Sequence, residues 1–201
     1  PILQANGVPD DFKYLAVIES GLTPVVSPAG ATGFWQIMKT TGKEFGLEIN
    51  NEVDERYHII KSTEAACEYL IQAHEKFGNW TLAAASYNMG MGGLNRQLEK
   101  QQVNSYYALD LNSETGRYVY RIIVAKEIMS NPEKYGFHYR QNQLWNNVET
   151  DPMVVDTAIA DLALFAKDLG IYYKILLEFN PWLRSNTLTS KSENSYTLHI
   201  P

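Results

Sequence analysis

Residues 10–22 read DDFKYLAVIESGL, and this stretch decides the fold of the first half of the chain. Asp10 and Asp11 favour the start of a helix, because carboxylates there accept from free backbone N–H groups and meet the positive end of the helix dipole. Gly21 is a natural residue just past a helix end. The pattern therefore predicts a helix through residues 12–19 that stops at Gly21.

One carboxylate interrupts the apolar face of this predicted helix. Phe12, Leu15, Ala16 and Glu19 lie at i, i+3, i+4 and i+7, which places them on one face. Burial raises the pKa of a carboxyl group, and the negative end of the helix dipole in the last turn acts in the same direction. Both effects favour the protonated form that a general acid requires. Periodicity alone favours a simpler alternative, a glutamate at the rim of the core with its carboxylate in water.

Helical segments separated by Gly, Pro and Asn continue to about residue 140. The loop at residues 23–33 carries two Pro and two Gly. No long alternating pattern predicts a sheet in this half of the chain. We expect further helices over residues 34–45, from Ser62 as N-cap to Gly78, and over residues 80–88 and 114–130.

The pattern changes after Tyr139, where a polar stretch at residues 141–143 marks a boundary. Short apolar runs and turn residues then predict a strand over residues 144–150, a helix capped at Asp156 and running through Lys167, a helix over 172–179 and a closing strand over 196–200. The chain thus divides into a mainly α domain at residues 1–140 and a small α+β module of βααβ order at residues 141–201.

Composition excludes several classes of function. The formal net charge of −6 argues against nucleic-acid binding, which relies on clustered Lys and Arg. The single Cys67 excludes an intrachain disulfide, and the four histidines lack metal-ligand spacing, so we expect no metal and no other cofactor. No apolar run approaches membrane-spanning length. The chain begins Pro1-Ile2 without an initiator Met or a signal-peptide pattern, which is typical of a mature or trimmed protein.

Four short motifs occur in order along the chain: ESGL at 19–22, SPAGATGFWQ at 27–36, SYN at 86–88 and ETGRYV at 114–119. Their order and spacing resemble those of family 1 lytic transglycosylases, whose catalytic domain has a goose-lysozyme-like helical fold. Trp35 and residues 114–119 are most similar to the membrane-bound lytic transglycosylase D branch. The similarity covers about residues 8–136, with Phe34 in place of a usual Leu and Ser86 in place of a usual Ala.

The resemblance implies one catalytic residue and a set of residues around a cleft. Glu19 matches the catalytic acid of the family, and Ser20 matches a neighbour that orients the reacting sugar. Gln36 matches a residue that hydrogen-bonds sugar or positions the acid. The other matched positions would shape or line the cleft: Ser27 and Gly33 in the loop, Tyr87 and Asn88 on its floor, Tyr118 within reach of the acid, and Glu114 as a second carboxylate or a brace for its own helix.

The resemblance also implies a reaction that needs a single carboxylate. Glu19 would protonate the bond between N-acetylmuramic acid and N-acetylglucosamine (MurNAc and GlcNAc) in peptidoglycan, and then accept the proton of the muramyl C6 hydroxyl as it closes a 1,6-anhydro ring. Most glycosidases instead need two carboxylates. A hydrolytic lysozyme on the same scaffold would use Glu114 or Asp54 as the second. A third alternative is a non-catalytic wall-binding protein.

Residues 145–201 resemble a LysM module, a βααβ unit that binds peptidoglycan. The likeness rests on residues 159–160, 166–171, 177–181 and 198–201, whereas the usual opening phrase is degraded to Val155-Asp156-Thr157-Ala158. The alternative is a docking module that packs on the catalytic helices. We expect a monomer in the bacterial envelope or secreted, acting on glycan strands, with membrane attachment only through a lipid anchor on a segment ahead of Pro1.

Overall fold

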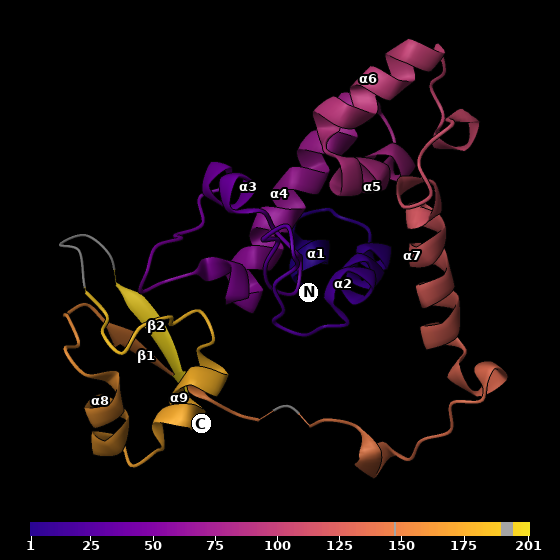
Figure 1. The fold of residues 1–201 in the computed structure, drawn as a ribbon. Helices are drawn as coiled ribbons and strands as arrows, with labels where there is room; N and C mark the ends of the chain where they lie inside the picture. The colour runs from indigo at the N-terminus through magenta and orange to yellow at the C-terminus, as the bar shows by residue number, and fades with distance from the viewer. Residues whose placement is uncertain (147, 190–194) are drawn as a thin grey trace.

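The structure is a computed structural model that describes residues 1–146, 148–189 and 195–201. Helices α2, α4, α5 and α7 form a helical body from which α6 extends, and the two strands with α8 and α9 form a small lobe beside it (Figure 1). The predicted mainly α chain with a βααβ module is thus confirmed. The elements are α1 Ile2–Ala5, η1 Asp10–Phe12, α2 Lys13–Ser20, α3 Lys39–Glu44, η2 Glu55–Tyr57, α4 Ile59–Phe77, α5 Trp80–Met89, α6 Met91–Gln101, η3 Tyr106–Ala108, α7 Thr115–Ser130, η4 Pro132–Tyr135, η5 Gln141–Gln143, β1 Asp151–Val155, α8 Leu162–Asp168, α9 Tyr173–Phe179 and β2 Tyr196–Ile200.

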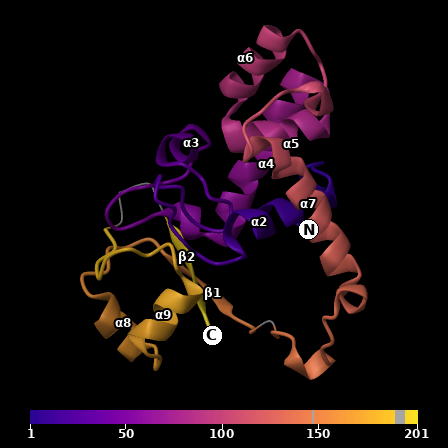
Figure 2. The same ribbon diagram turned by 45° about the vertical axis from the view of Figure 1, so that its right-hand side comes forward.

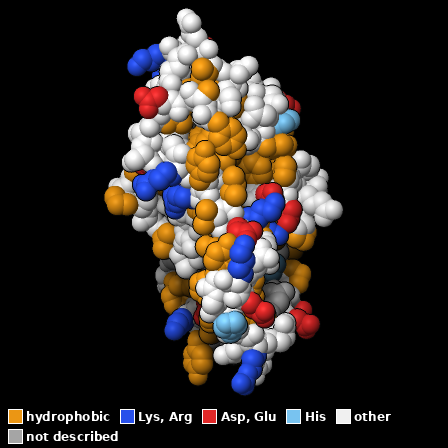
Figure 3. All heavy atoms as spheres, turned by 90° about the vertical axis from the view of Figure 1, so that its right-hand side faces the viewer, with side chains coloured by type: hydrophobic (Ala, Val, Ile, Leu, Met, Phe, Trp, Pro, Cys, Tyr) orange, Lys and Arg blue, Asp and Glu red, His pale blue; other side chains and the backbone are white. Residues whose placement is uncertain are grey.

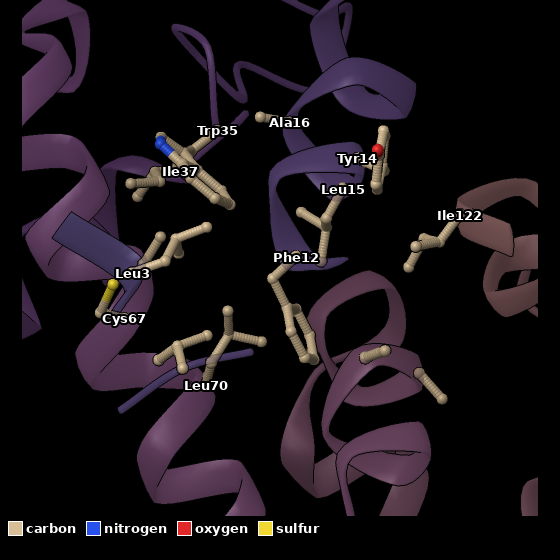
Figure 4. Close-up of a cluster of buried hydrophobic side chains, with 14 of the residues drawn as sticks. Leu3, Phe12, Tyr14, Leu15, Ala16, Trp35, Ile37, Cys67, Leu70 and Ile122 are labelled. Carbon is tan, nitrogen blue, oxygen red and sulfur yellow. The ribbon is translucent and has the colours of Figure 1, made fainter. Parts of the chain in front are cut away.

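The apolar face of α2 lies at the centre of the helical body. Figure 4 shows Phe12 and Leu15 turned toward Leu70 of α4, with Trp35 on the same cluster. Leu15 and Leu70 have no exposed surface, so each contributes roughly 1.5–3 kcal/mol of burial free energy. The predicted helix and its apolar face are therefore confirmed, and Gly21 ends the helix in the left-handed region at φ 61°.

The C-terminal module has a core of its own. β1 pairs antiparallel with β2, and Met153 lies opposite Leu198. Leu162 of α8 and Leu176 of α9 are fully buried in the same cluster as Leu198. Val53 and Tyr57 of the helical body also belong to this cluster, so the module packs directly against the body.

Two helix starts in the body differ from the prediction. α3 begins at Lys39 rather than residue 34, because the backbone bridges Thr32 to Ile37 and Gln36 takes a φ of 49°, which no α-helix contains. α4 begins ahead of Ser62, since His58 is its N-cap and Ser62 lies buried inside the helix.

Four further differences concern a helix cap, an unpredicted helix, a helix start and a strand. Asp10 and Asp11 form a 3-10 turn without a side-chain cap bond. Helix α5 ends at Met89 with Gly90 as its C-cap, which confirms the predicted end of that helix, but the stretch that follows begins a helix that was not predicted, α6. α8 begins only at Leu162, where Asp161 rather than Asp156 caps the helix. The first strand is β1, and the described residues of 144–150 contain no strand.

The described residues between α7 and β1, which include η4 and η5, run beneath the body in both ribbon views (Figures 1 and 2). Figure 3 shows hydrophobic side chains gathered on the face that α7 occupies, where Tyr107, Tyr120, Ile123 and Val124 are exposed. Across residues 1–146, 148–189 and 195–201, no helix combines the length and apolar character needed to cross a membrane.

Candidate functional site

Glu19 occupies the last turn of α2 and is half-buried. The hydroxyl of Tyr118 on α7 donates a hydrogen bond to its carboxylate, and Nη2 of Arg121 donates to the carbonyl of Ile18 at 2.8 Å. Burial raises the pKa of Glu19 above its ordinary value. The Tyr118 hydrogen bond and the Arg121 charge oppose that rise in part, whereas the charge of Glu114 adds to it. The raised pKa predicted from the sequence is confirmed, and the carboxyl group is suited to carry a proton.

Two tyrosines flank this carboxyl group. Tyr118 is 1% exposed, and Tyr87 of α5 donates its hydroxyl proton to the carbonyl of Trp35 at 2.8 Å. Burial first, and then the charge of Glu19, raises the pKa of both tyrosines well above the ordinary value. Both phenols therefore stay neutral donors at neutral pH, and Tyr118 donates to Glu19 without becoming an anion.

The loop after α2 folds back on the end of that helix. Ser20 Oγ donates to the carbonyl of Phe34 at 2.8 Å, which ties the residue beside Glu19 to the loop. Gln36 Nε2 donates to the carbonyls of Val25 at 3.0 Å and Gly33 at 2.8 Å. The amide nitrogen of Gln36 is thus used to brace the loop, and its oxygen is the atom left to meet a ligand.

The other two loop residues singled out from the sequence hold the backbone of the loop. Ser27 Oγ accepts from the backbone N–H of Ala31 at 3.0 Å, which closes a tight turn. Gly33 has φ 81°, and a Cβ there would lie 2.0 Å from the carbonyl oxygen of Arg56. Only glycine allows this close approach of two backbones.

A short polar chain joins α5 to the start of α7. Asn88 Nδ2 donates to Glu114 Oε1 at 3.2 Å, and Thr115 Oγ1 donates to Asn88 Oδ1 at 2.8 Å. Glu114 is exposed, and its charge acts on Glu19. The structure therefore places Glu114 near the acid while Asn88 holds one of its oxygens.

A pocket of about 190 Å³ lies between α3, α4 and α5, and Gln36, Tyr87 and Asn88 line it. Its other walls include Phe45 and Tyr69, which the sequence reasoning did not single out. Their rings pack edge to face at 5.9 Å, and Tyr69 packs in the same way on Tyr87 at 5.3 Å. Glu19 does not line this pocket, so Tyr87 is the side chain that connects the pocket to the acid.

Arg56 is a second residue that sequence reasoning missed. Its guanidinium holds the carboxylate of Asp54 at 2.9 Å and 2.7 Å and donates to the carbonyls of Gly30 and Ile37 at 3.1 Å and 3.2 Å. Both members of the ion pair are buried. Asp54, one of the two carboxylates that a hydrolytic alternative would use, is hydrogen-bonded to Arg56 through both of its oxygens. The spacing of an acid two residues before an arginine was the available signal.

No group of three or more His, Cys, Asp or Glu side chains able to hold a metal ion occurs in the described parts of the chain. Cys67 is free and completely buried. Burial raises the pKa of its thiol to about 11, with smaller contributions from Glu64 and Glu68. The polar groups that act on Glu19 are the phenol of Tyr118, the guanidinium of Arg121 and the carboxylate of Glu114.

Known proteins match both parts of the chain. A model of the transglycosylase SLT domain matches residues 3–109, and one of the soluble lytic transglycosylase C-terminal LysM-like domain matches residues 151–201. Membrane-bound lytic murein transglycosylase D of Escherichia coli strain K12 is 27% identical over 195 residues, which is 92% of this chain and 42% of that protein. The chain therefore spans less than half the length of this relative.

Two solved structures share the fold. The 70 kDa soluble lytic transglycosylase SLT70 of Escherichia coli aligns with a TM-score of 0.51 and 24% identity, covering 62% of this chain and 22% of that one. An inactive mutant of the lytic transglycosylase Slt of Pseudomonas aeruginosa aligns with a TM-score of 0.52 and 23% identity, covering 66% of this chain and 23% of that one. Since the first family model covers more than half of the chain, the protein belongs to the transglycosylase SLT domain family and carries a LysM-like module of the same family's C-terminal type.

Proposed function

We propose that this chain is a peptidoglycan lytic transglycosylase that breaks the MurNAc–β-1,4–GlcNAc bond without water and leaves 1,6-anhydroMurNAc ends. The observation that carries the proposal is the half-buried Glu19, whose raised pKa and neutral Tyr118 donor suit an acid that must later act as a base. Gln36, Tyr87 and Asn88 offer amide and phenol groups in the pocket that Tyr87 connects to Glu19, and these are groups that hydrogen-bond sugars. The names of the relatives point the same way.

In the proposed reaction Glu19 first gives its proton to the glycosidic oxygen, so that the GlcNAc leaving group departs as an alcohol. The acetamido oxygen of the muramyl residue stabilises the positive anomeric carbon in place of a protein nucleophile. Glu19, now ionised, accepts the proton of the C6 hydroxyl while that oxygen bonds to C1. The proton count balances, and the intramolecular attack benefits from a high effective concentration. Tyr118 stabilises the carboxylate between the two steps.

The arrangement of the other carboxylates supports this route over hydrolysis. An inverting hydrolase needs a second carboxylate that is free to activate water. Asp54 is held on both oxygens by Arg56, and Glu114 is held on one oxygen by Asn88. Glu114 is therefore the group that a hydrolytic alternative would have to use.

Mass spectrometry of digested peptidoglycan tests the proposal. Anhydro ends are one water lighter than reducing ends, so a lytic transglycosylase gives the lighter products. Glu19→Gln keeps the size and hydrogen bonding of the side chain but removes the proton transfer, and we expect cleavage to disappear while glycan binding persists. Glu75→Gln, the same change at an exposed carboxylate of α4, is the matched control, and Glu114→Gln should still give anhydro ends because no second carboxylate takes part. Reducing ends alone would establish a lysozyme instead, and cleavage by the Glu19→Gln variant would mean that another group is the acid.

The substrate and the cellular location follow from the same proposal. The substrate is the GlcNAc-MurNAc polymer, and the site of action is the bacterial cell envelope. We propose a monomer with a catalytic domain at residues 1–140 and a LysM-like or docking module at residues 141–201. Any attachment to a membrane would come through a lipid anchor outside the chain described.

A further inference from the structure

We propose that Arg56 is a positioning residue for the loop at residues 25–37, and that the C-terminal module holds Arg56 in place by docking on residues 52–54. The module would then be a structural part of the active site rather than a tethered wall-binding unit. This proposal rests on the proposed function where it concerns turnover, and on contacts within the chain where it concerns the loop.

The first step is the contact between Arg56 and the loop. One nitrogen of the guanidinium, Nη1, donates to Gly30 and Ile37, two carbonyls seven residues apart in the chain. The carbonyl oxygen of Arg56 would lie 2.0 Å from a Cβ at Gly33, so no side chain fits there. Arg56 therefore contacts the loop through both its side chain and its backbone. Asp54 fixes the plane of the guanidinium.

The second step runs from the loop to the acid. The carbonyl of Phe34 accepts from Ser20, the neighbour of Glu19, and the carbonyl of Trp35 accepts from Tyr87. Gln36, the next residue, lines the pocket. A shift of the loop thus moves three groups of the candidate site together, and a displacement of about 1 Å can cost about 100-fold in turnover.

The third step is the joint between the module and the segment that carries Arg56. Val53 forms an antiparallel bridge with Leu183, with Asp54 N donating to the carbonyl of Trp182 at 2.9 Å. The carbonyl of Glu52 accepts from the N–H of Arg184 at 2.7 Å. The backbone of the module thus pairs with residues 52–54, which end two residues before Arg56.

Side chains reinforce this joint on both sides. The carboxylate of Glu52 accepts from Thr187 Oγ1 at 2.7 Å and from the backbone N–H of Thr189 at 2.8 Å. The guanidinium of Arg184 lies 4.3 Å from the ring centroid of Tyr57, and His58 stacks on Trp182 at 5.9 Å. These hydrogen bonds and ring contacts dock the module on the helical body, in agreement with the core cluster that Val53 and Tyr57 share with the module.

Hydrogen–deuterium exchange of the full chain tests the proposal without depending on activity. In Arg56→Lys, which keeps the charge but loses the planar fork, we expect the loop amides of Gly33 and Ile37 to exchange about 10-fold faster. In Glu52→Ala, which removes the side-chain hydrogen bonds to Thr187 and Thr189 of the module but leaves Arg56 itself unchanged, we expect them to exchange about 3-fold faster. Amides of the α4 and α5 core should keep their protection, because general destabilisation would speed them as well.

Two variants serve as controls. Glu52→Gln retains an acceptor oxygen for Thr189 and should restore most of the protection. Glu75→Ala removes an exposed carboxylate from α4 and should change nothing. Unchanged loop exchange in both Arg56→Lys and Glu52→Ala would overturn the proposal, as would loss of core protection equal to that of the loop.

Kinetics on uncrosslinked glycan strands then connect the joint to turnover. We expect kcat to fall about 10-fold in Arg56→Lys and about 3-fold in Glu52→Ala, with KM changed by less than about 2-fold. A wild-type chain without anhydro products would refute the proposed function alone, since the exchange data would still stand. An active wild type with faster loop exchange but unchanged kcat in both variants would refute the link to catalysis.

Discussion

The close approach of Gly33 to Arg56 predicts that two glycines of the same loop respond very differently to substitution. Gly33 and Gly30 have φ values of 81° and 84°, so alanine at either position pays a similar cost for left-handed backbone, about 1–2 kcal/mol. A Cβ at Gly30 meets nothing within 4 Å, whereas a Cβ at Gly33 would lie 2.0 Å from the carbonyl oxygen of Arg56. The difference in unfolding free energy between Gly33→Ala and Gly30→Ala therefore comes from the clash with Arg56 alone.

The separation of 2.0 Å determines how much unfolding free energy the Gly33→Ala variant should lose. Non-bonded heavy atoms prefer separations of about 3.5–4.0 Å, so the loop at Gly33 has to move by more than 1 Å or break its contacts. Overpacking of this kind typically costs about 1–3 kcal/mol, and here the opposing atom is backbone and cannot rotate away. We expect Gly30→Ala to lower the free energy of unfolding by about 1–2 kcal/mol and Gly33→Ala by about 4 kcal/mol.

Urea denaturation followed by tryptophan fluorescence measures the free energy of unfolding of both variants. Equal slopes of that free energy against urea concentration would establish that both variants expose the same surface area on unfolding. Displacement of the loop at Gly33 also moves Gln36, which donates to the carbonyl of Gly33. Release of anhydro products should therefore drop in Gly33→Ala and stay near wild type in Gly30→Ala. A difference between the two variants below about 0.5 kcal/mol would refute the close approach as the reason for glycine at this position.

Three other predictions follow from single groups. Tyr118→Phe removes a hydrogen bond that lowers the pKa of Glu19, so the pKa of Glu19 should rise further. Since Glu19 acts in its protonated form in the proposed reaction, the alkaline limb of the pH profile of kcat/KM should move to higher pH. An alkaline limb that does not move would contradict the pairing of Tyr118 with Glu19. Asn180→Ala removes the side-chain amide that hydrogen-bonds both the backbone N–H and the C=O of His199. The free energy of unfolding of the module, measured by urea denaturation, should fall by about 2–3 kcal/mol. A loss below about 1 kcal/mol would show that water replaces the amide. Cys67, with its pKa raised to about 11 by burial, should resist a thiol reagent at neutral pH until urea unfolds the chain, and rapid labelling of the native protein would disprove its burial.

The parts of the fold that sequence alone predicts are those with local causes. α2 combines apolar residues at helical spacing with a glycine at its end, and the structure shows both the helix and its buried face. The strand at residues 196–200 alternates as a half-buried strand should, and it forms β2. In each case the signals that specify the element lie within a few residues of it, so no tertiary contact is needed to find them.

The parts that escaped prediction have distant causes. α3 starts late because Thr32 bridges to Ile37, and that bridge belongs to a loop whose shape Arg56 holds from outside. Gly33 could be recognised as a residue in a small-residue loop, but the backbone it approaches lies more than twenty positions away in the sequence. The pocket walls Phe45 and Tyr69 likewise meet only because α3 and α4 pack together. Such contacts leave no periodic pattern in the sequence.

The acid itself shows how the two kinds of cause combine. The sequence predicts the direction of the pKa shift of Glu19 from its apolar face, and burial is indeed the main cause. The opposing contributions come from Tyr118 and Arg121, which lie 99 and 102 positions further along the chain and one turn apart on α7. Burial at the end of α2 therefore raises the pKa, while Tyr118 and Arg121 of α7 limit how far it rises. In the proposed reaction Glu19 must give up and recover its proton in each cycle, so the spacing of Tyr118 and Arg121 on α7 would matter to that reaction as much as the helix that carries Glu19.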